Sequence, residues 1–239
     1  MSKILAIETA TEACSAAVIL DDHTITERFQ LAPREHTKLL LPMMEEVLKE
    51  AGVTLNELDA IAFSCGPGAF TGLRIAAGVA QGAALAIDKP VIPVSTLFAL
   101  AMTDLELADE DIIVSALDAR MGEVYWGMFC YRGNEIIALA DECVSKPQEM
   151  MKVAQLTSED KPGAKIYAIG TGWDAYADPL FENGKPDNLN HVKNVFPKAE
   201  HVAKLAVLAY LRGEAVPPEE AQPVYIRNKV AEKSKTIKK

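Results

Sequence analysis

The chain has 239 residues, of which 49% are hydrophobic, and a formal net charge of −10. This length allows one large domain or two small ones, and the hydrophobic content is typical of a globular protein with a sizeable core. The acidic balance argues against independent binding of nucleic acid, since phosphate contacts need clustered Lys and Arg. Glu8 interrupts any signal-peptide core and no uninterrupted apolar run is long enough to span a bilayer, so we expect a cytoplasmic protein that does not enter a membrane.

The first half of the chain predicts the element order β-β-β-α-β-α-β-α. Apolar alternation and helical spacing indicate strands at 3–8, 14–20 and 24–30, a helix at 36–51, a strand at 58–63, a helix at 74–87, a strand at 91–94, and a helix opened by Ser95.

After the acidic stretch 104–111 the pattern starts again. It indicates strands at 112–118, 123–131 and 134–139, a helix after Pro147, a strand at 165–169 and a helix at 199–212. The two halves superpose at an offset of about 110 residues, which places Glu8 on Asp118.

This duplication predicts an α/β protein with two similar ribonuclease H-like lobes at 1–105 and 106–212, as in the superfamily of actin, sugar kinases and Hsp70. The segment 213–230 is a candidate to pack back on the first lobe. A basic tail is expected to be a solvated end; it contains Lys229, Lys233, Lys235, Lys238 and Lys239.

The run from Ser64 to Arg74, SCGPGAFTGLR, is a glycine-rich turn between a strand and a helix. Such turns often bind phosphate, but Gly72-Leu73-Arg74 stands where a Walker loop needs Gly-Lys-Ser/Thr. We expect a Thr cap in the first turn of the helix. Gly78 and Gly82 each cost roughly 1 kcal/mol within a helix. The helix therefore packs tightly on its own sheet, or also on a helix of another chain; the sequence leaves both interpretations open.

The sequence shows no arrangement of residues that is typical of a catalytic site. The four histidines lack the spacing of a metal-ligand pair on one helix turn; they are His23, His36, His191 and His201. We therefore expect no metal and no cofactor, and no catalytic residues.

A residual nucleotide site between the lobes is the weaker of two interpretations of several polar and glycine residues. The candidates are Glu8, Thr9, Asp118, Arg120, Gly170 and Gly172. In the kinases of this superfamily an Asp ends the first strand, whereas Glu8 is longer by a C–C bond, which is a poor fit to octahedral Mg²⁺. The other interpretation is structural, with Asp118 paired to Arg120 or capping a turn.

Several stretches together resemble the bacterial TsaB (YeaZ) family. They are ILAIETATEACSAAVI, REHTKLLLPMMEEVL, LDAIAFSCGPGAFTGLRIAAGVAQGAALA, VSTL, LDARMGEVYWGMF, IGTGW and AQPVYIRNKVA. The resemblance implies a non-catalytic paralogue of the peptidase M22-like subunit TsaD. It implies work with TsaD and the ATPase TsaE in placing a threonylcarbamoyl group on adenosine 37 of tRNAs reading codons that begin with A, with tRNA contacted only through the assembled complex.

The expected partner surface is formed by the helices at 36–51 and 74–87, meeting two equivalent helices of TsaD, or of a second copy in an isolated homodimer. Its candidate residues are Leu39, Leu40, Met43, Met44, Val47, Arg74, Ala77, Gly78, Gln81 and Gly82. The alternative function is a stand-alone enzyme of the same fold, either a glycoprotease like peptidase M22 or an ATP-dependent kinase.

Overall fold

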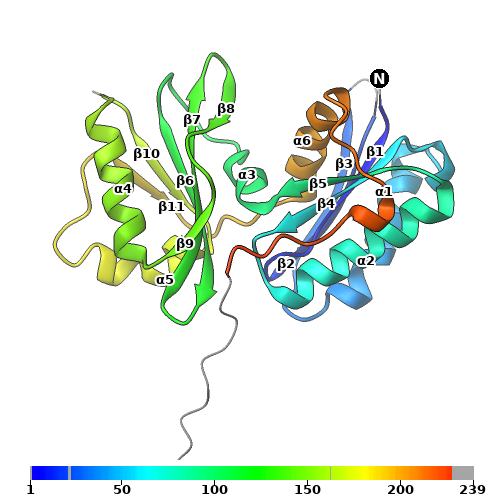
Figure 1. Cartoon of the computed structure of the whole chain (residues 1–239), viewed down its shortest axis with the longest axis horizontal. Coiled ribbons are helices and arrows are strands. Elements are labelled where there is room, and N and C mark those ends of the chain that lie inside the picture. Colours follow the sequence, from blue (N-terminus) through cyan, green and yellow to red (C-terminus); the bar gives the residue numbers. More distant parts are fainter. Residues whose placement is uncertain (1, 21–22, 162, 228–239) are drawn as a thin grey trace, which may run out of the picture.

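The computed structural model describes residues 2–20, 23–161 and 163–227. Two lobes lie side by side, each built on one mixed sheet (Figure 1). The Lys-rich tail predicted from the sequence, and part of the expected turn at 21–23, lie outside these residues.

The first lobe carries a five-stranded sheet in the order β3-β2-β1-β4-β5. Strands β1, β2 and β3 are antiparallel neighbours, whereas β4 and β5 run parallel to β1. Its elements are β1 (Ile4–Glu8), β2 (Ala13–Ile19), β3 (Ile25–Leu31), α1 (His36–Ala51), a 3-10 turn η1 (Leu55–Glu57), β4 (Ala60–Gly66), α2 (Phe70–Ile87), β5 (Val91–Ser95) and α3 (Thr96–Ala101).

The second lobe repeats this topology in the order β11-β10-β6-β7-β8, with β9 paired to β7. Its elements are β6 (Ile112–Arg120), β7 (Glu123–Arg132), β8 (Glu135–Ala138), β9 (Cys143–Ser145), α4 (Pro147–Glu159), β10 (Ile166–Ile169), α5 (Thr171–Leu180) and β11 (Leu189–Val192). Because β6 takes the place of β1 and β10 that of β4, the molecule is a duplicated ribonuclease H-like fold of the actin, sugar-kinase and Hsp70 type. The fold prediction is confirmed.

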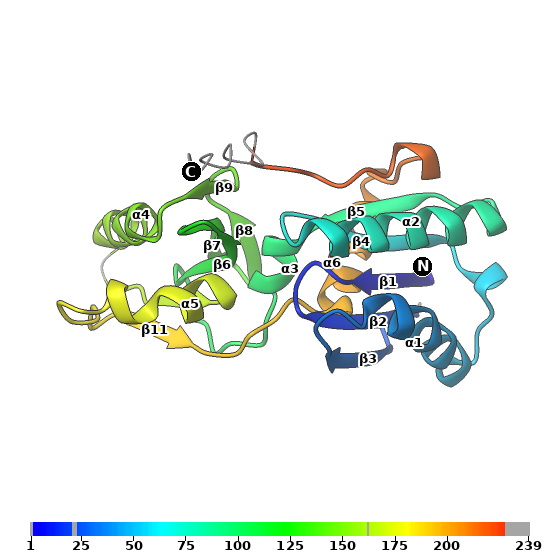
Figure 2. The same cartoon turned by 90° about the horizontal axis from the view of Figure 1, so that it is seen from below.

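Helices cover both faces of the first sheet. Helices α1 and α2 lie on one face, over a core that contains Ile7, Phe63 and Val47. Helix α6 (Ala199–Leu211) lies on the opposite face, as Figure 2 shows, with Val202 against Ile4. The expected lobe boundary at residue 212 therefore needs correction, because α6 buries its apolar side on the first sheet although it follows the second lobe in sequence.

The described C-terminal segment also returns to the first lobe. Val216 forms an isolated antiparallel bridge with Val91, a 3-10 turn η2 follows (Pro218–Glu220), and Ala221 is buried in the core under α2. In Figure 1 this segment then crosses toward the second lobe.

The caps predicted for two helices have different outcomes. The hydroxyl of Ser95 accepts a hydrogen bond from the Phe98 amide at 3.0 Å, so it caps α3 as the sequence predicts. The predicted Thr cap of α2 is wrong, because the helix begins at Phe70, its N-cap is Ala69 and no side chain caps it. The sequence analysis missed β9, α5 and β11, which are short or carry weak apolar periodicity.

Helix α2 meets the length and composition expected of a membrane-crossing helix, a test that core helices of globular proteins also pass. It packs along β4 with Leu73, Ala76 and Ala80 fully buried. Its apolar character is therefore used, in part, to build the core of the first lobe.

The start of α2 lies unusually close to the turn after β1. A Cβ built on Gly72 would lie 1.9 Å from the carbonyl oxygen of Thr9, whereas one built on Gly78 would meet nothing within 4 Å. Glycine is thus required at 72 by the approach of another backbone, whereas no contact among the described residues requires glycine at 78.

We predict opposite effects for alanine at these two positions. Gly72→Ala forces the backbones apart and should lower the free energy of unfolding by more than about 2 kcal/mol. Gly78→Ala, its matched control, should raise it by up to about 1 kcal/mol through helix propensity. Urea denaturation in dilute solution measures both, and a Gly72→Ala protein as stable as the wild type would contradict the close contact.

Candidate functional site

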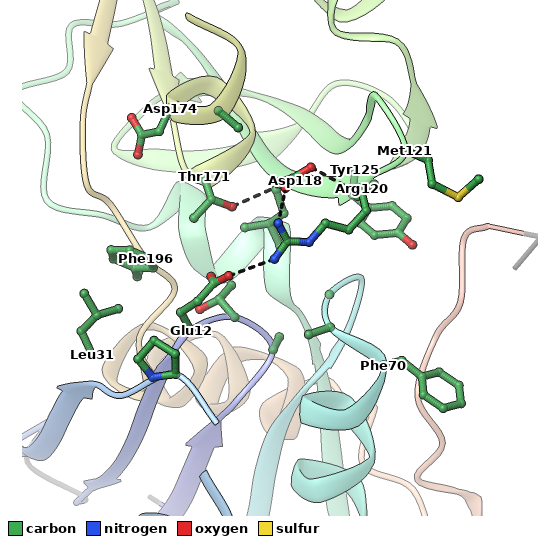
Figure 3. A pocket seen from close by; sticks show the side chains of 18 of the residues that line it. Glu12, Leu31, Phe70, Asp118, Arg120, Met121, Tyr125, Thr171, Asp174 and Phe196 are labelled. Carbon is green, nitrogen blue, oxygen red and sulfur yellow. Dashed lines mark hydrogen bonds and ion pairs between the residues drawn. The ribbon is translucent and has the colours of Figure 1, made fainter. Parts of the chain in front are cut away.

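A cleft of about 720 Å³ opens between the lobes, where strands β1 and β6 end. Its walls come from the turn after β1, the start of α2, the β6–β7 turn and the first turns of α5. Figure 3 shows Glu12 and Arg120 pointing toward each other across it. This is the place where the ends of equivalent strands from the two lobes meet.

Glu8 lies beneath the cleft rather than in it. Its side chain is fully buried and accepts hydrogen bonds from the Ala10 amide and the Ser64 hydroxyl. Burial raises the pKa of Glu8 to about 7, although both hydrogen bonds act in the opposite direction. Thr9 is also buried, and its hydroxyl donates to the Gly72 carbonyl at 2.8 Å. Both side chains are used within the fold, so neither is presented to a ligand in the cleft.

Asp118 and Arg120 do face the cleft, as a pair. The Arg120 guanidinium lies 2.9 Å from Asp118 Oδ2, and the Arg120 amide donates to Asp118 Oδ1 at 2.9 Å. The same guanidinium reaches Glu12 of the first lobe at 3.4 Å. Tyr176 donates a further hydrogen bond to Asp118 at 3.3 Å. Asp118, near the end of β6, is thus ion-paired with an arginine of its own strand.

Gly170 and Gly172 serve packing in the same way as Gly72. A Cβ on Gly170 would lie 2.4 Å from the Ala116 carbonyl oxygen, and one on Gly172 would lie 2.9 Å from the Ala116 Cβ. These glycines let the start of α5 approach β6. Their pattern in the sequence is therefore explained without a nucleotide, and the nucleotide interpretation stays an untested prediction.

The segment that the sequence analysis expected to pack back on the first lobe continues, from Val224 to Arg227, as a strap that joins the two lobes at one end of the cleft. The Val224 amide donates to the Cys65 carbonyl at 2.7 Å, and the Val224 carbonyl occupies the space where a Cβ of Gly66 would stand, at 2.5 Å. Tyr225 accepts a hydrogen bond from Arg74 at 3.3 Å.

Arg227 completes the strap on the second lobe. Its guanidinium donates to the Ala119 carbonyl at 3.0 Å and pairs with Glu123, and it lies 5.8 Å from the ring centre of Tyr125. The only sequence signal for these contacts was the stretch that contains Tyr225 and Arg227, because contacts between residues more than 100 positions apart leave no local pattern.

The described ranges contain no group of three His, Cys, Asp or Glu side chains that could hold a metal ion. Two of the histidines serve local structure. His36 contacts the carbonyl oxygens of Thr11 and Ala13, and His191 lies 2.9 Å from Asp174. These imidazoles position loops and helices around the cleft.

The expected partner surface on α1 needs correction. Leu40, Met43, Met44 and Val47 are buried in the core beneath α1, and Leu39 is half-buried against the same core. They cover the chain's own sheet, since the apolar face of a helix packs first on its own lobe. In the single chain they offer little surface to a partner.

Helix α2 presents a different face. Phe70, Arg74, Gly78, Gly82 and Ala86 are exposed at intervals of four residues, and we call this row the α2 stripe. Residues four apart lie on one side of a helix, so the stripe is continuous.

The other predicted residues of α2 lie inside the fold. Ala77 is buried, and the Gln81 side chain donates to the Ala221 carbonyl at 3.1 Å. The expected interface on α2 therefore narrows to Arg74, Gly78 and Gly82. A groove of about 540 Å³ separates the start of this helix from that of α1, between Ile75 and Thr37.

Fold and site together define a two-lobed α/β protein of the actin, sugar-kinase and Hsp70 class, in which the acid of the first lobe, Glu8, is buried and that of the second, Asp118, is paired with Arg120. The family profile described as "TsaD: tRNA N6-adenosine threonylcarbamoyltransferase" matches residues 19–235.

Two proteins named tRNA threonylcarbamoyladenosine biosynthesis protein TsaB are similar over almost the whole chain. The Escherichia coli protein is 40% identical, with 96% of each chain covered. The Haemophilus influenzae protein is 37% identical, with 95% of this chain and 94% of the relative covered. A solved structure of YeaZ from Pseudomonas aeruginosa has a TM-score of 0.79 and 39% identity, covering 94% of this chain and all of that one.

A second Pseudomonas aeruginosa structure, described as similar to peptidase YeaZ, gives a TM-score of 0.82 at 42% identity. It covers 95% of this chain and 100% of its own. The chain therefore belongs to the TsaB (YeaZ) family, and the family predicted from the sequence motifs is confirmed.

The buried acid makes stability depend on pH. Folding raises the pKa of Glu8 from 4.5 to about 7, so the folded protein favours the protonated carboxyl. The contribution of this group to the free energy of unfolding is therefore fully present below pH 4.5, where Glu8 is protonated in both the folded and the unfolded chain. That stabilisation is lost as the pH rises toward 7. We predict that the free energy of unfolding of Glu8→Gln, relative to that of the wild type, rises by up to about 3 kcal/mol between pH 5 and pH 8.

Urea denaturation across this pH range measures the difference. The exposed Glu45→Gln variant controls for the loss of one negative charge. If the difference in free energy of unfolding between Glu8→Gln and the wild type stays constant over this pH range, Glu8 does not titrate as expected.

Proposed function

We propose that this chain acts in tRNA threonylcarbamoyladenosine biosynthesis as a non-catalytic subunit that pairs with its catalytic paralogue TsaD. The proposal is supported by the names of the TsaB relatives and by the length over which they match. It deepens the family assignment by giving this chain a role in association rather than in chemistry.

The α2 stripe is the observation that carries the proposal. Outside the backbone of their own helix, the described residues place no atom within 4 Å of a Cβ built on Gly78 or Gly82, although each glycine lowers helix stability by roughly 1 kcal/mol. Leu85, beside the stripe, is 64% exposed. Two helix-weakening glycines and an exposed leucine on one side of a helix are well suited to close contact with the backbone of another chain. We propose TsaD as that chain, and a second copy of this chain when TsaD is absent.

The state of the cleft supports the non-catalytic part of the proposal. Glu8 is buried and held by Ser64 and Ala10, and Asp118 is paired with Arg120. A carboxylate must be free to bind a metal ion or to accept a proton from substrate. In both lobes the acid at this position is already bound by groups of the chain itself, Glu8 through hydrogen bonds and Asp118 through an ion pair.

The remaining parts of the proposal follow the family resemblance. TsaE joins the pair, the product is modified adenosine 37 in tRNAs reading codons that begin with A, and tRNA is contacted through the assembled complex. The net charge of −10 supports this indirect contact, because a strongly acidic chain repels phosphate. The place of action is the cytoplasm.

We predict that reconstitution needs this chain. TsaD, TsaE, threonine, bicarbonate, ATP, the enzyme that forms the activated threonylcarbamoyl group, and unmodified tRNA are combined with and without it. The modified nucleoside is measured by mass spectrometry, and it should fall by at least about tenfold when this chain is omitted. Modification undiminished by the omission would overturn the proposal.

Leucine on the α2 stripe should block association. Gly78→Leu with Gly82→Leu places two large side chains where a partner backbone would lie, and we predict a loss of both TsaD binding and self-association. Gln155→Leu, on an exposed face of α4, adds a leucine of the same size elsewhere and should bind normally. Analytical ultracentrifugation measures both, and full association of the double variant would contradict the predicted surface.

A further inference from the structure

The strap brings a second aromatic ring to the start of α2. The ring centres of Phe70 and Tyr225 lie 5.7 Å apart, yet Phe70 is 51% exposed and Tyr225 is 47% exposed. Figure 3 shows the Phe70 side chain turned away from the Glu12–Arg120 pair, toward the C-terminal segment. Exposed apolar side chains that gather on one surface are typical of sites that bind another molecule, whereas scattered ones are not.

Arg74 is held by both of these aromatic residues. Its guanidinium carbon lies 3.9 Å from the centre of the Phe70 ring, and its Nε donates a hydrogen bond to the Tyr225 hydroxyl at 3.3 Å. A guanidinium over an aromatic face is attracted by the negative charge of that face. The two contacts therefore orient the guanidinium, although Arg74 is an exposed residue.

The two Nη atoms of this oriented guanidinium are free. A guanidinium carries five N–H groups, and Nε supplies only one of them. Among the described residues, no hydrogen bond and no ion pair engages either Nη atom of Arg74. The planar fork of an arginine can bind a carboxylate through two parallel hydrogen bonds. Arg74 thus offers a fork whose orientation is fixed before any partner arrives.

The two arginines that line the interlobe cleft differ from Arg74. Arg120 is paired with two acids, and Arg227 is paired with Glu123. Of these three arginines, only Arg74 lacks an acidic partner among the described residues. A nucleic-acid strand needs several free cations in a row, and the net charge of −10 repels it at long range. A single free guanidinium suits one carboxylate of a protein.

Arg74 also lies in the α2 stripe, one helical turn before Gly78. A partner chain that runs along Gly78 and Gly82 therefore also passes this arginine. We propose that Arg74, Phe70 and Tyr225 anchor the interface with TsaD. The Nη atoms of Arg74 bind an Asp or Glu side chain of TsaD, and the two rings pack against an apolar side chain beside it. Arginine and tyrosine are among the residues that most often dominate the binding energy of interfaces.

This inference rests on the proposed function, and it adds the chemistry of the partner and a contribution from the strap. Isothermal titration calorimetry of TsaD with wild-type and variant chains tests it. Arg74→Ala should raise the Kd at least about 30-fold, and Arg74→Lys roughly tenfold, because lysine keeps the charge but has no fork. Arg212→Ala, which removes an exposed arginine at the end of α6, is the matched control and should leave the Kd unchanged. An unchanged Kd for Arg74→Ala would overturn the inference.

Tyr225→Phe tests whether the strap positions Arg74. This variant keeps the ring but removes the hydroxyl that accepts the Arg74 hydrogen bond. It should raise the Kd roughly threefold in the wild-type chain and have no further effect in Arg74→Ala, because the two residues act together. Equal weakening in both chains would show that Tyr225 acts independently of Arg74, and it would remove the strap from the anchor.

A scan of TsaD tests the carboxylate. Its exposed Asp and Glu residues are changed one at a time to Asn and Gln. At least one change should weaken binding to the wild-type chain and leave binding to Arg74→Ala unaltered. If none does, the carboxylate assignment is wrong.

Other occupants of this surface give different results. If Arg74→Ala keeps its affinity for TsaD but loses self-association, or weakens tRNA binding by the assembled complex, Arg74 serves a second copy or RNA and the inference is refuted. The absence of any complex between the wild-type chain and TsaD would overturn the proposed function itself. A complex that forms but is insensitive to Arg74 would overturn only this inference.

Discussion

The contact between the start of α2 and the turn after β1 is the constraint on which the rest of this structure depends. Gly72 brings the helix backbone against Thr9, the Thr9 hydroxyl donates to the Gly72 carbonyl, and the Ala69 amide donates to the Ala10 carbonyl at 2.7 Å. The amide that a phosphate-binding turn would offer to a ligand is therefore used by the chain's own carbonyl. The same motif returns in the second lobe, where Gly170 and Gly172 approach Ala116.

This contact decides what the cleft contains. Closing the turn over Glu8 removes that acid from solvent and raises its pKa, so the position that carries a metal-binding Asp in related kinases carries a structural acid here. On the other wall, Asp118 is matched by Arg120, which also reaches Glu12 of the first lobe. The charged side chains Glu12, Asp118 and Arg120 of the cleft thus pair with one another, in part across the two lobes.

The outer helices differ in how much of their apolar surface packs within the chain itself. The leucine, methionine and valine side chains of α1 pack into the core on one face of the first sheet. Helix α6, although it follows the second lobe in sequence, covers the opposite face. Helix α2 exposes the α2 stripe, and the strap through Tyr225 and Arg227 links the beginning of that row to the second lobe. A partner on α2 would thus touch an element that is tied to both lobes.

The sequence by itself determined the duplicated order of elements, most of their limits, the family and the positions of the unusual glycines. These features are local, because apolar periodicity, turn residues and short motifs are written in neighbouring positions. Tertiary structure alone decided that Met43 and Met44 point into the core, that α6 belongs to the first sheet, and that Glu8 is buried. It also decided the strap, because the strap depends on contacts between residues distant in sequence, and burial is a property of the packed chain.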